Sequence, residues 1–188
     1  MKILFLLGAM VCTLGMMASC GIRSENNNTD TTLILIGDSC PNGGYVRLRN
    51  IMAIRVDSTG TVYISNDMND QVMCDLNQLS VQVKDFISNP NDNPEFSEKV
   101  LTDIPLIGDY PVSKGIVSLH IIEGTPKEKV NNVFHALAVS FIDLRDSLSQ
   151  DIFGQHYGEL DAERASAIMT AIPIAVMNPD SMKFYCVQ

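Results

Sequence analysis

The sequence predicts an α+β fold in which a small sheet packs against two or three helices. Residues 51–57, 61–65 and 115–122 alternate apolar and polar side chains, which is the pattern of half-buried strands. Residues 76–87 and 130–148 instead carry an apolar residue every three or four positions, as amphipathic helices do. Because strands and helices are interleaved along the chain, we expect helical layers on one small sheet.

The composition suits one globular domain with an acidic surface. The chain has 188 residues, of which 46 % are apolar and 19 % charged, enough for a buried core and too apolar for a disordered chain. The formal net charge is −9 and the sequence has no basic patch, which argues against nucleic-acid binding. By the same reasoning, anionic lipid or phosphate is expected to have little reason to bind.

An uncharged apolar run, residues 3–19, follows Met1 and Lys2. A basic start, an apolar middle and small residues at the end are typical of a secretory signal. The run is also short for a membrane-spanning helix, which needs about 20 residues. We therefore expect residues 1–19 to be a cleaved signal peptide, and the alternative is an uncleaved N-terminal anchor.

Cys20 is the expected lipid-bearing residue. Ala18 and Ser19 stand directly before it, an ending that resembles the lipobox of bacterial lipoproteins, with Met17 in place of the usual leucine. In such proteins the peptide is cut before the cysteine, and the thiol receives a diacylglyceryl group. The polar residues that follow make 20–32 a lipidated, flexible tether, and about 12 residues of coil reach about 20 Å. Residues 33–188 then form the domain, and 33–48 are assigned only as a strand and a loop.

Residues 51–65 are predicted to form a hairpin around the Ser58-Thr59-Gly60 turn. A helix follows, with Asp75 as its N-cap and Gln78 three positions on, a capping-box pattern. Asn89-Pro90 ends this helix, because a residue before proline avoids helical backbone. The apolar stripe of the helix consists of Leu76, Leu79, Val83, Phe86 and Ile87.

Residues 89–114 form a long excursion punctuated by proline, to which no element is assigned. Residues 115–122 read as a strand with Val117, Leu119 and Ile121 on one face, and its apolar character on both faces indicates a central strand. The next helix is predicted to start with Thr125 as cap, Pro126 at its first position and Glu128 at its third.

The second helix has the longest amphipathic pattern in the chain and is predicted to end at Gly154. Its stripe consists of Val130, Phe134, Leu137, Phe141, Leu144 and Leu148. A shorter helix then begins at the cap Asp161, with Ala165, Ile168 and Met169 directed inward. Residues 172–177 and 182–187 are assigned as strands around an Asn178-Pro179-Asp180 turn.

Several phrases in this order resemble the periplasmic domain of the ExbD/TolR family, over roughly residues 50–180. They are VYISN, LNQLSVQVKDFISNPNDNPEFSEKV, DIPLIGDYPVSKGIVSLH and FIDLRDSLSQDIFGQHYGELDAERASAIMTAIPIAVMNP. The resemblance implies one transmembrane helix before this domain and a partner channel-like protein in the inner membrane. In that family, proton flow drives a third protein that pulls on outer-membrane transporters or tethers the envelope, and an intramembrane aspartate handles the proton.

The N-terminal run departs from the family, because residues 3–19 contain no Asp or Glu. We therefore expect a non-enzymatic, lipid-anchored accessory module of TonB/Tol-type energy-coupled transport that does not relay protons. Its domain would face the periplasm. Its expected partners are the membrane, through lipid on Cys20, an ExbB/TonB-type inner-membrane complex and a second copy of the chain. The alternative is a periplasmic lipoprotein that binds a peptidoglycan fragment or small ligand in a cleft between helices and sheet.

No residue pattern points to catalysis, a cofactor or a metal. His120, His135 and His156 have the spacing of neither a metal site nor a catalytic triad. Asp67, Asp70 and Asp75 lie close together but lack the glycine and the final glutamate of a calcium loop. Ser113-Lys114 has no accompanying base. Cys40, Cys74 and Cys186 would remain after export, and their spacing does not choose a disulfide pair.

Two kinds of interaction surface are considered. Leu137, Phe141 and Leu144 could line a partner groove, although packing against the sheet is the usual meaning of such a stripe. A strand edge is the better candidate, since an added strand binds through backbone hydrogen bonds and demands little of the sequence. The edges expected are Val62 to Ser65 and the C-terminal strand around Phe184.

Overall fold

The computed structural model describes the backbone of residues 32–35, 44–65, 71–179 and 183–185, and the side chains of residues 46–65 and 71–179. The predicted signal peptide, Cys20 and most of the tether therefore lie outside the described residues. In the part that is described, no helix is both long enough and apolar enough to cross a bilayer.

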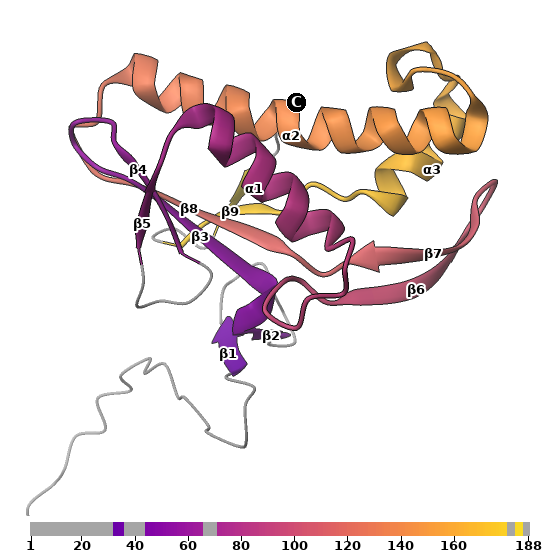
Figure 1. The fold of residues 1–188 in the computed structure, drawn as a ribbon, viewed down its shortest axis with the longest axis horizontal. Helices are drawn as coiled ribbons and strands as arrows, with labels where there is room; N and C mark the ends of the chain where they lie inside the picture. The colour runs from indigo at the N-terminus through magenta and orange to yellow at the C-terminus, as the bar shows by residue number, and fades with distance from the viewer. Residues whose placement is uncertain (1–31, 36–43, 66–70, 180–182, 186–188) are drawn as a thin grey trace, which may run out of the picture.

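A six-stranded mixed sheet forms the centre of the molecule, with three helices packed beside it (Figure 1), which confirms the predicted α+β class. Its strand order is β10-β9-β8-β3-β4-β5. The strands are β3 (Ile51–Val56), β4 (Val62–Ser65), β5 (Val72–Cys74), β8 (Ile116–Ile121), β9 (Val176–Asn178) and β10 (Lys183–Tyr185). β8 pairs in parallel with β3 on one side and β9 on the other, so it is central as predicted.

β3 and β4 form the predicted hairpin, and its turn is organised by Asp57. The Asp57 carboxylate accepts hydrogen bonds from the backbone N–H groups of Thr59 (2.8 Å) and Thr61 (3.0 Å). Gly60 has a φ of 86°, and a Cβ at that position would lie 2.5 Å from Cγ of Lys129. The turn therefore needs glycine both for its backbone conformation and for the close approach of the helix that contains Lys129.

Helices α1 (Leu76–Ser88), α2 (Lys127–Phe153) and α3 (Ala162–Ala171) lie on one side of the sheet (Figure 1). α1 begins at the predicted cap, where the Asp75 carboxylate accepts from the backbone N–H of Gln78 at 2.8 Å. α2 ends at Gly154 in the left-handed conformation, and Asp161 caps α3, both as predicted. The fully buried side chains of the three helices include Leu79, Phe86, Leu137, Phe141 and Ile168.

The helices and the sheet share one hydrophobic core. Met52, Ile54, Val56, Val62, Ile64, Val117 and Leu119 point from the strands toward the helices and are almost completely buried. All of the buried apolar residues that are described lie between Ile51 and Met177.

Two local predictions are wrong. The Thr125 hydroxyl does not cap α2, because it lies 2.9 Å from the Asp57 carbonyl and 2.6 Å from the Ile122 carbonyl, to which it donates. It ties the loop after β8 to the end of β3. Met169 is 43 % exposed, because the buried face of α3 is made by its neighbours Ala167, Ile168 and Ala171.

Two short antiparallel hairpins lie outside the main sheet. β1 (Thr32–Leu35) pairs with β2 (Gly44–Arg47), and the 3-10 turn η1 (Leu48–Asn50) leads from β2 into β3. β6 (Lys99–Ile104) pairs with β7 (Gly108–Ser113) in the segment 89–114 to which the sequence assigned no element. This second hairpin extends away from the sheet toward α3 (Figure 1).

Candidate functional site

The predicted chemical residues are spread over the fold. His120 is half-buried on β8, His135 is exposed on α2, and His156 lies in the loop after α2. Among the described residues, no group of three or more His, Cys, Asp or Glu side chains could hold a metal ion. Asp75 serves as the cap of α1, and Asp67 and Asp70 lie outside the described residues.

Cys74 is a free, buried cysteine at the end of β5. Burial raises the pKa of its thiol, and the negative charge of Asp75 raises it further. The thiol lies 3.2 Å from the Asp75 carbonyl. Cys40 and Cys186 lie outside the described residues, so their pairing stays untested.

The Ser113 hydroxyl is used inside the fold. It lies 2.8 Å from the hydroxyl of Ser97, which is completely buried, and accepts from the backbone N–H of Gly115 at 3.0 Å. Lys114 points instead toward Glu98. The two side chains of the Ser113-Lys114 pair therefore have separate structural partners.

The apolar stripe of α2 packs into the core. Leu137 and Phe141 are completely buried, and Leu144 is partly buried against the same core. This result confirms the interpretation of the stripe as core packing.

One of the two predicted strand edges is wrong. Val62–Ser65 is β4, which pairs with β3 on one side and β5 on the other and so is not an edge. The C-terminal strand around Phe184 is β10, which ends the described sheet as predicted. The opposite edge is β5, a strand of three residues that the sequence did not indicate.

β5 presents two exposed apolar side chains beside a hollow. Val72 is 64 % exposed and Met73 70 %. Next to them, a hollow of about 640 Å³, here called the β5 hollow, lies between the start of α1, the start of α2 and the strand. Its lining includes Val62, Met73, Cys74, Leu76, Lys129 and Val133.

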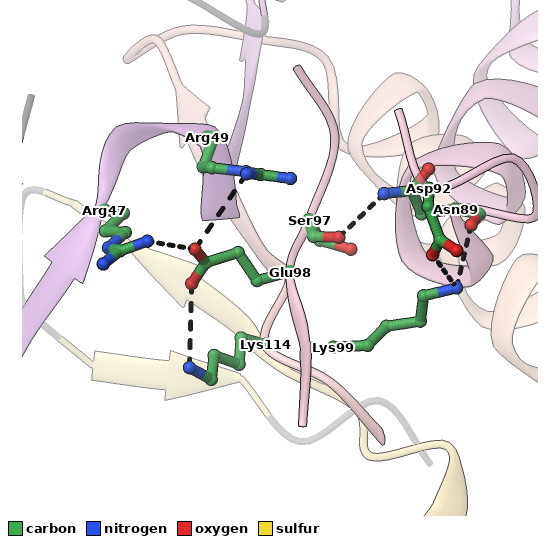
Figure 2. A pocket seen from close by; sticks show the side chains of 8 residues that line it. All are labelled: Arg47, Arg49, Asn89, Asp92, Ser97, Glu98, Lys99 and Lys114. Atoms are coloured by element: carbon green, nitrogen blue, oxygen red, sulfur yellow. Dashed lines mark hydrogen bonds and ion pairs between the residues drawn. The ribbon is translucent and has the colours of Figure 1, made fainter. Parts of the chain in front are cut away.

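A highly charged site is formed by a hollow of about 400 Å³, here called the basic hollow (Figure 2). β2 and η1 contribute one wall, the loop after α1 a second, and the ends of β6 and β7 a third. Its lining consists of Arg47, Arg49, Asn89, Asp92, Ser97, Glu98, Lys99 and Lys114. Four cations and two carboxylates therefore surround one small space.

Glu98 lies at the centre of the basic hollow (Figure 2). Its carboxylate accepts a hydrogen bond from Arg47 and forms ion pairs with Arg49 at 4.0 Å and Lys114 at 3.6 Å. Burial acts to raise the pKa of this carboxyl group, but the hydrogen bonds of Asn50 and Arg47 and the nearby positive charges outweigh it and lower the pKa. Glu98 therefore stays charged and holds three cations toward one point.

Asn50 fixes Glu98 from behind. It is 3 % exposed, donates from Nδ2 to the Glu98 carboxylate at 3.2 Å and accepts from the Glu98 backbone N–H at 2.7 Å. This two-point contact fixes both the backbone and the side chain of Glu98, so the carboxylate is part of the wall rather than a mobile surface group.

The loop between α1 and β6 is organised by Asn89, a residue with a φ of 37°. Its side chain donates to the carbonyls of Asn93 and Ser97, each at 3.0 Å. Lys99 donates to the Asn89 carbonyl at 3.0 Å and pairs with Asp92 at 2.7 Å (Figure 2). The loop thus fixes the ammonium group of Lys99, the first residue of β6, on the second side of the hollow.

The basic hollow corrects the expectation that a chain of this composition lacks a basic patch. Its cations come from positions 47, 49, 99 and 114, so no window of the sequence contains them together. The sequence held one partial indication of this site. Two of the phrases that carry the family resemblance contribute to its lining: the one ending in SEKV supplies Glu98 and Lys99, and the one containing PVSKG supplies Lys114.

Comparisons with protein-family models, with curated proteins and with solved structures find no match to this chain.

Proposed function

We propose that this chain is a non-enzymatic, lipid-anchored envelope protein of ExbD/TolR type that acts as an accessory interaction module in TonB/Tol-type energy-coupled transport. Lipid on Cys20 would hold the domain at the membrane, on the periplasmic side. The support is the resemblance of the phrases between residues 50 and 180, together with an α+β fold in which those phrases supply most of the core.

The edge strand β5 is the observation that carries the interaction role. An edge strand offers backbone donors and acceptors to an extended segment of a partner, which then adds to the sheet. Val72 and Met73 are both more than half exposed there, so apolar side chains are available on the two faces of the strand. The β5 hollow beside them has room for a side chain of the added segment.

The module would bind a proton-driven complex without powering it. Residues 3–19 contain no acidic residue, so the chain has no carboxyl group there to carry a proton through hydrocarbon. In this proposal the proton pathway belongs to the ExbB/TonB-type partner, and this chain supplies a binding surface.

The test is co-purification with the inner-membrane complex. The variant Val72→Asp/Met73→Asp is expected to lose the complex, because two carboxylates oppose the pairing of a strand at that edge. The matched control is Val81→Asp/Ile142→Asp, which adds the same charge at two positions that are 52 % and 50 % exposed on α1 and α2. Equal retention of the complex by both variants would contradict the proposal.

One observation favours a second function. The β5 hollow lies between helices and sheet and combines apolar walls with one ammonium group, that of Lys129, and one carboxylate, that of Asp75, as a site for a small polar ligand would. The alternative is therefore a lipoprotein that binds a peptidoglycan fragment or another small ligand there. Retention of the protein on purified cell-wall sacculi, with no inner-membrane complex in the eluate, would favour this alternative.

A further inference from the structure

The β6–β7 hairpin is a two-stranded sheet of its own, so within the described part of the chain each of its strands keeps one free edge. Figure 1 shows β7 on the side of the hairpin toward α3 and β6 on the opposite side. Each strand has six residues, whereas β5 and β10, the end strands of the main sheet, have three each. A long unpaired edge is a ready template for another strand.

The hydrogen-bond pattern shows which backbone groups of β6 face outward. The Lys114 N–H donates to the Glu98 carbonyl at 2.7 Å, and these two residues continue the register of the hairpin. Because hydrogen-bonded and non-hydrogen-bonded pairs alternate along an antiparallel ladder, Leu101 and Pro111 form a non-hydrogen-bonded pair. Residues 99, 101 and 103 therefore direct their N–H and C=O groups to the free edge of β6.

Proline blunts the free edge of β7 but not that of β6. By the same alternation, the backbone nitrogen of Pro111 faces away from β6, and proline has no N–H to donate there. The residue opposite it on β6 is Leu101, which keeps its outward N–H. A strand can therefore be added beside β6, whereas the centre of β7 has no donor for one.

The outer face of the hairpin carries an apolar pair and an acidic pair. Leu101 lies opposite Pro111 and is 67 % exposed. Asp103 lies directly opposite Asp109, and both are exposed. Like charges in directly opposite positions are destabilising, so the acidic pair is unfavourable within a single chain. A strand added beside β6 would stabilise the hairpin if it covered Leu101 and placed a positive charge next to Asp103.

A second copy of β6 has the sequence that such a strand requires. In an antiparallel pair centred on Leu101, the two Leu101 residues face each other, and Asp103 of each copy faces Lys99 of the other. The other registers that pair the outward residues place Leu101 opposite a charge or place two like charges opposite each other. Lys99 already pairs with Asp92 at 2.7 Å and donates to the Asn89 carbonyl at 3.0 Å. The pairing leaves those contacts intact, because it is made by backbone groups and by Leu101.

We propose that two copies of this chain associate through β6, as a symmetric antiparallel pair that joins two hairpins into a four-stranded sheet. Each copy uses the same surface, so the contact is closed at two copies. The new sheet ends on both sides in β7, where Pro111 opposes the addition of a further strand. A second copy is already an expected partner of the proposed function; β6 gives it a surface, and β5 stays free for the transport complex.

The first measurement maps the register with single cysteine substitutions in the full chain in its membrane. At the centre of the pair the two Cα atoms of position 101 would lie about 5.5 Å apart, within the range of about 4.4–6.8 Å that a disulfide spans. Leu101→Cys should therefore give a covalent dimer on mild oxidation, identified by mass spectrometry of the peptide joined at that position. Asp103→Cys is the matched control, because four residues of strand, about 14 Å, separate the two copies of position 103. Absence of the joined peptide, or an equal yield from Asp103→Cys, would overturn the proposal.

The second measurement tests the backbone contact by analytical ultracentrifugation of the full chain in an uncharged detergent. Leu101→Pro removes an outward N–H and no ladder bond to β7, and it should weaken dimerisation about tenfold or more. Leu101→Asp, which places two carboxylates opposite each other, should do the same even if proline disturbs the hairpin. The control is Val81→Asp, the same kind of change at a position of α1 that is 52 % exposed. Dimerisation of both Leu101 variants as tight as that of Val81→Asp would show that β6 is not the contact.

The outcome is separable from that of the proposed function. The β5 variant Val72→Asp/Met73→Asp, which is expected to lose the transport complex, should still form the dimer. A dimer lost in the β5 variant and kept in Leu101→Pro would place the contact at β5 and overturn this assignment. A Leu101→Cys chain that becomes joined to a different protein, and not to itself, would mean that β6 binds a strand of another protein and would also overturn it.

Discussion

Glu98 and Asn50 show how a single buried amide can organise a charged site. The Glu98 carboxylate forms ion pairs with three cations, and it can hold them together only if its own position is fixed. Asn50 fixes Glu98, because its side chain accepts a hydrogen bond from the Glu98 backbone N–H and donates one to the Glu98 carboxylate. The basic hollow therefore depends on a residue that does not line it.

Replacing Asn50 with alanine is expected to lower the free energy of unfolding by about 1–3 kcal/mol, because the Glu98 N–H and carboxylate lose their partners in a poorly hydrated place. Asn77→Ala, at an exposed position in the first turn of α1, is the control and should change the stability little. Urea unfolding followed by circular dichroism measures both. An Asn50→Ala protein as stable as the Asn77→Ala protein would contradict this role.

Residue roles set by near neighbours in sequence were predictable, and those set by the tertiary fold were not. Asp75 and Asp161 cap their helices because the accepting oxygen and the N–H group lie three positions apart. Thr125 is also a residue type that commonly caps helices and it lies just before α2, but its hydroxyl donates to the Asp57 carbonyl, 68 positions away. No local pattern could indicate that partner.

At the scale of elements, the end of α2 is closed by polar contacts within the phrase LRDSLSQDIFGQHYGEL. The Asp146 carboxylate accepts from the Tyr157 backbone N–H at 2.8 Å and lies 3.0 Å from Nδ1 of His156. The Ser149 hydroxyl donates to the Gln155 carbonyl at 2.7 Å. Each contact joins the last turns of α2 to the loop that follows, so the phrase that carries the resemblance encodes the reversal of the chain.

The pair of His156 and Asp146 makes this reversal sensitive to pH. The hydrogen bond to Asp146 and the charge of Asp146 raise the pKa of His156 above its ordinary value of 6.5. The backbone hydrogen bond from Tyr157, followed by the contact with His156, lowers the pKa of Asp146. Because the folded pKa of His156 is raised, its contribution to stability is fully present below pH 6.5 and is lost as pH rises through the raised pKa.

Titration of the His156 ring by NMR should therefore give a midpoint above 6.5, and Asp146→Asn should move that midpoint down. The Tm of the unmodified chain should also fall, relative to that of His156→Gln, as pH rises through the midpoint. A His156 midpoint that is the same in the Asp146→Asn variant would show that the two groups do not interact in solution.

The helices and the β3–β4 hairpin were predictable because each has a single period and a turn or cap of its own. The β6–β7 hairpin was missed for a physical reason. Val100 and Leu101 are adjacent apolar residues of β6 that are both exposed, so the alternation that marks a half-buried strand is absent there. Similarly, β5 has only three residues, too few to show any period.

At the scale of the whole molecule, the fold brings together cations that are far apart in the sequence. The cations of the basic hollow are supplied by the end of β2, by η1 and by the two ends of the β6–β7 hairpin. They converge only because that hairpin returns next to η1. An overall charge of −9 therefore gave no information on where these four cations gather.

The proposed attachment to the membrane decides how the whole molecule could act. A lipid on Cys20 leaves the domain on one side of the bilayer, whereas an uncleaved run would place a spanning helix beside a partner channel. Cys20→Ala separates the two cases. If the run is a signal peptide, the variant should lose the lipid label and keep residues 1–19, so that it migrates as a longer chain than the mature protein.

Cys12→Ala is the matched control, since that cysteine lies inside the run and the variant should be processed and labelled normally. Size on a denaturing gel and incorporation of a radioactive lipid precursor, both after membrane fractionation, are the measurements. A Cys20→Ala protein that stays in the membrane at the size of the unmodified chain would make residues 3–19 a span. In that case the missing acidic residue would be the only remaining reason to exclude proton transfer, because the helix that the resemblance implies would then be present.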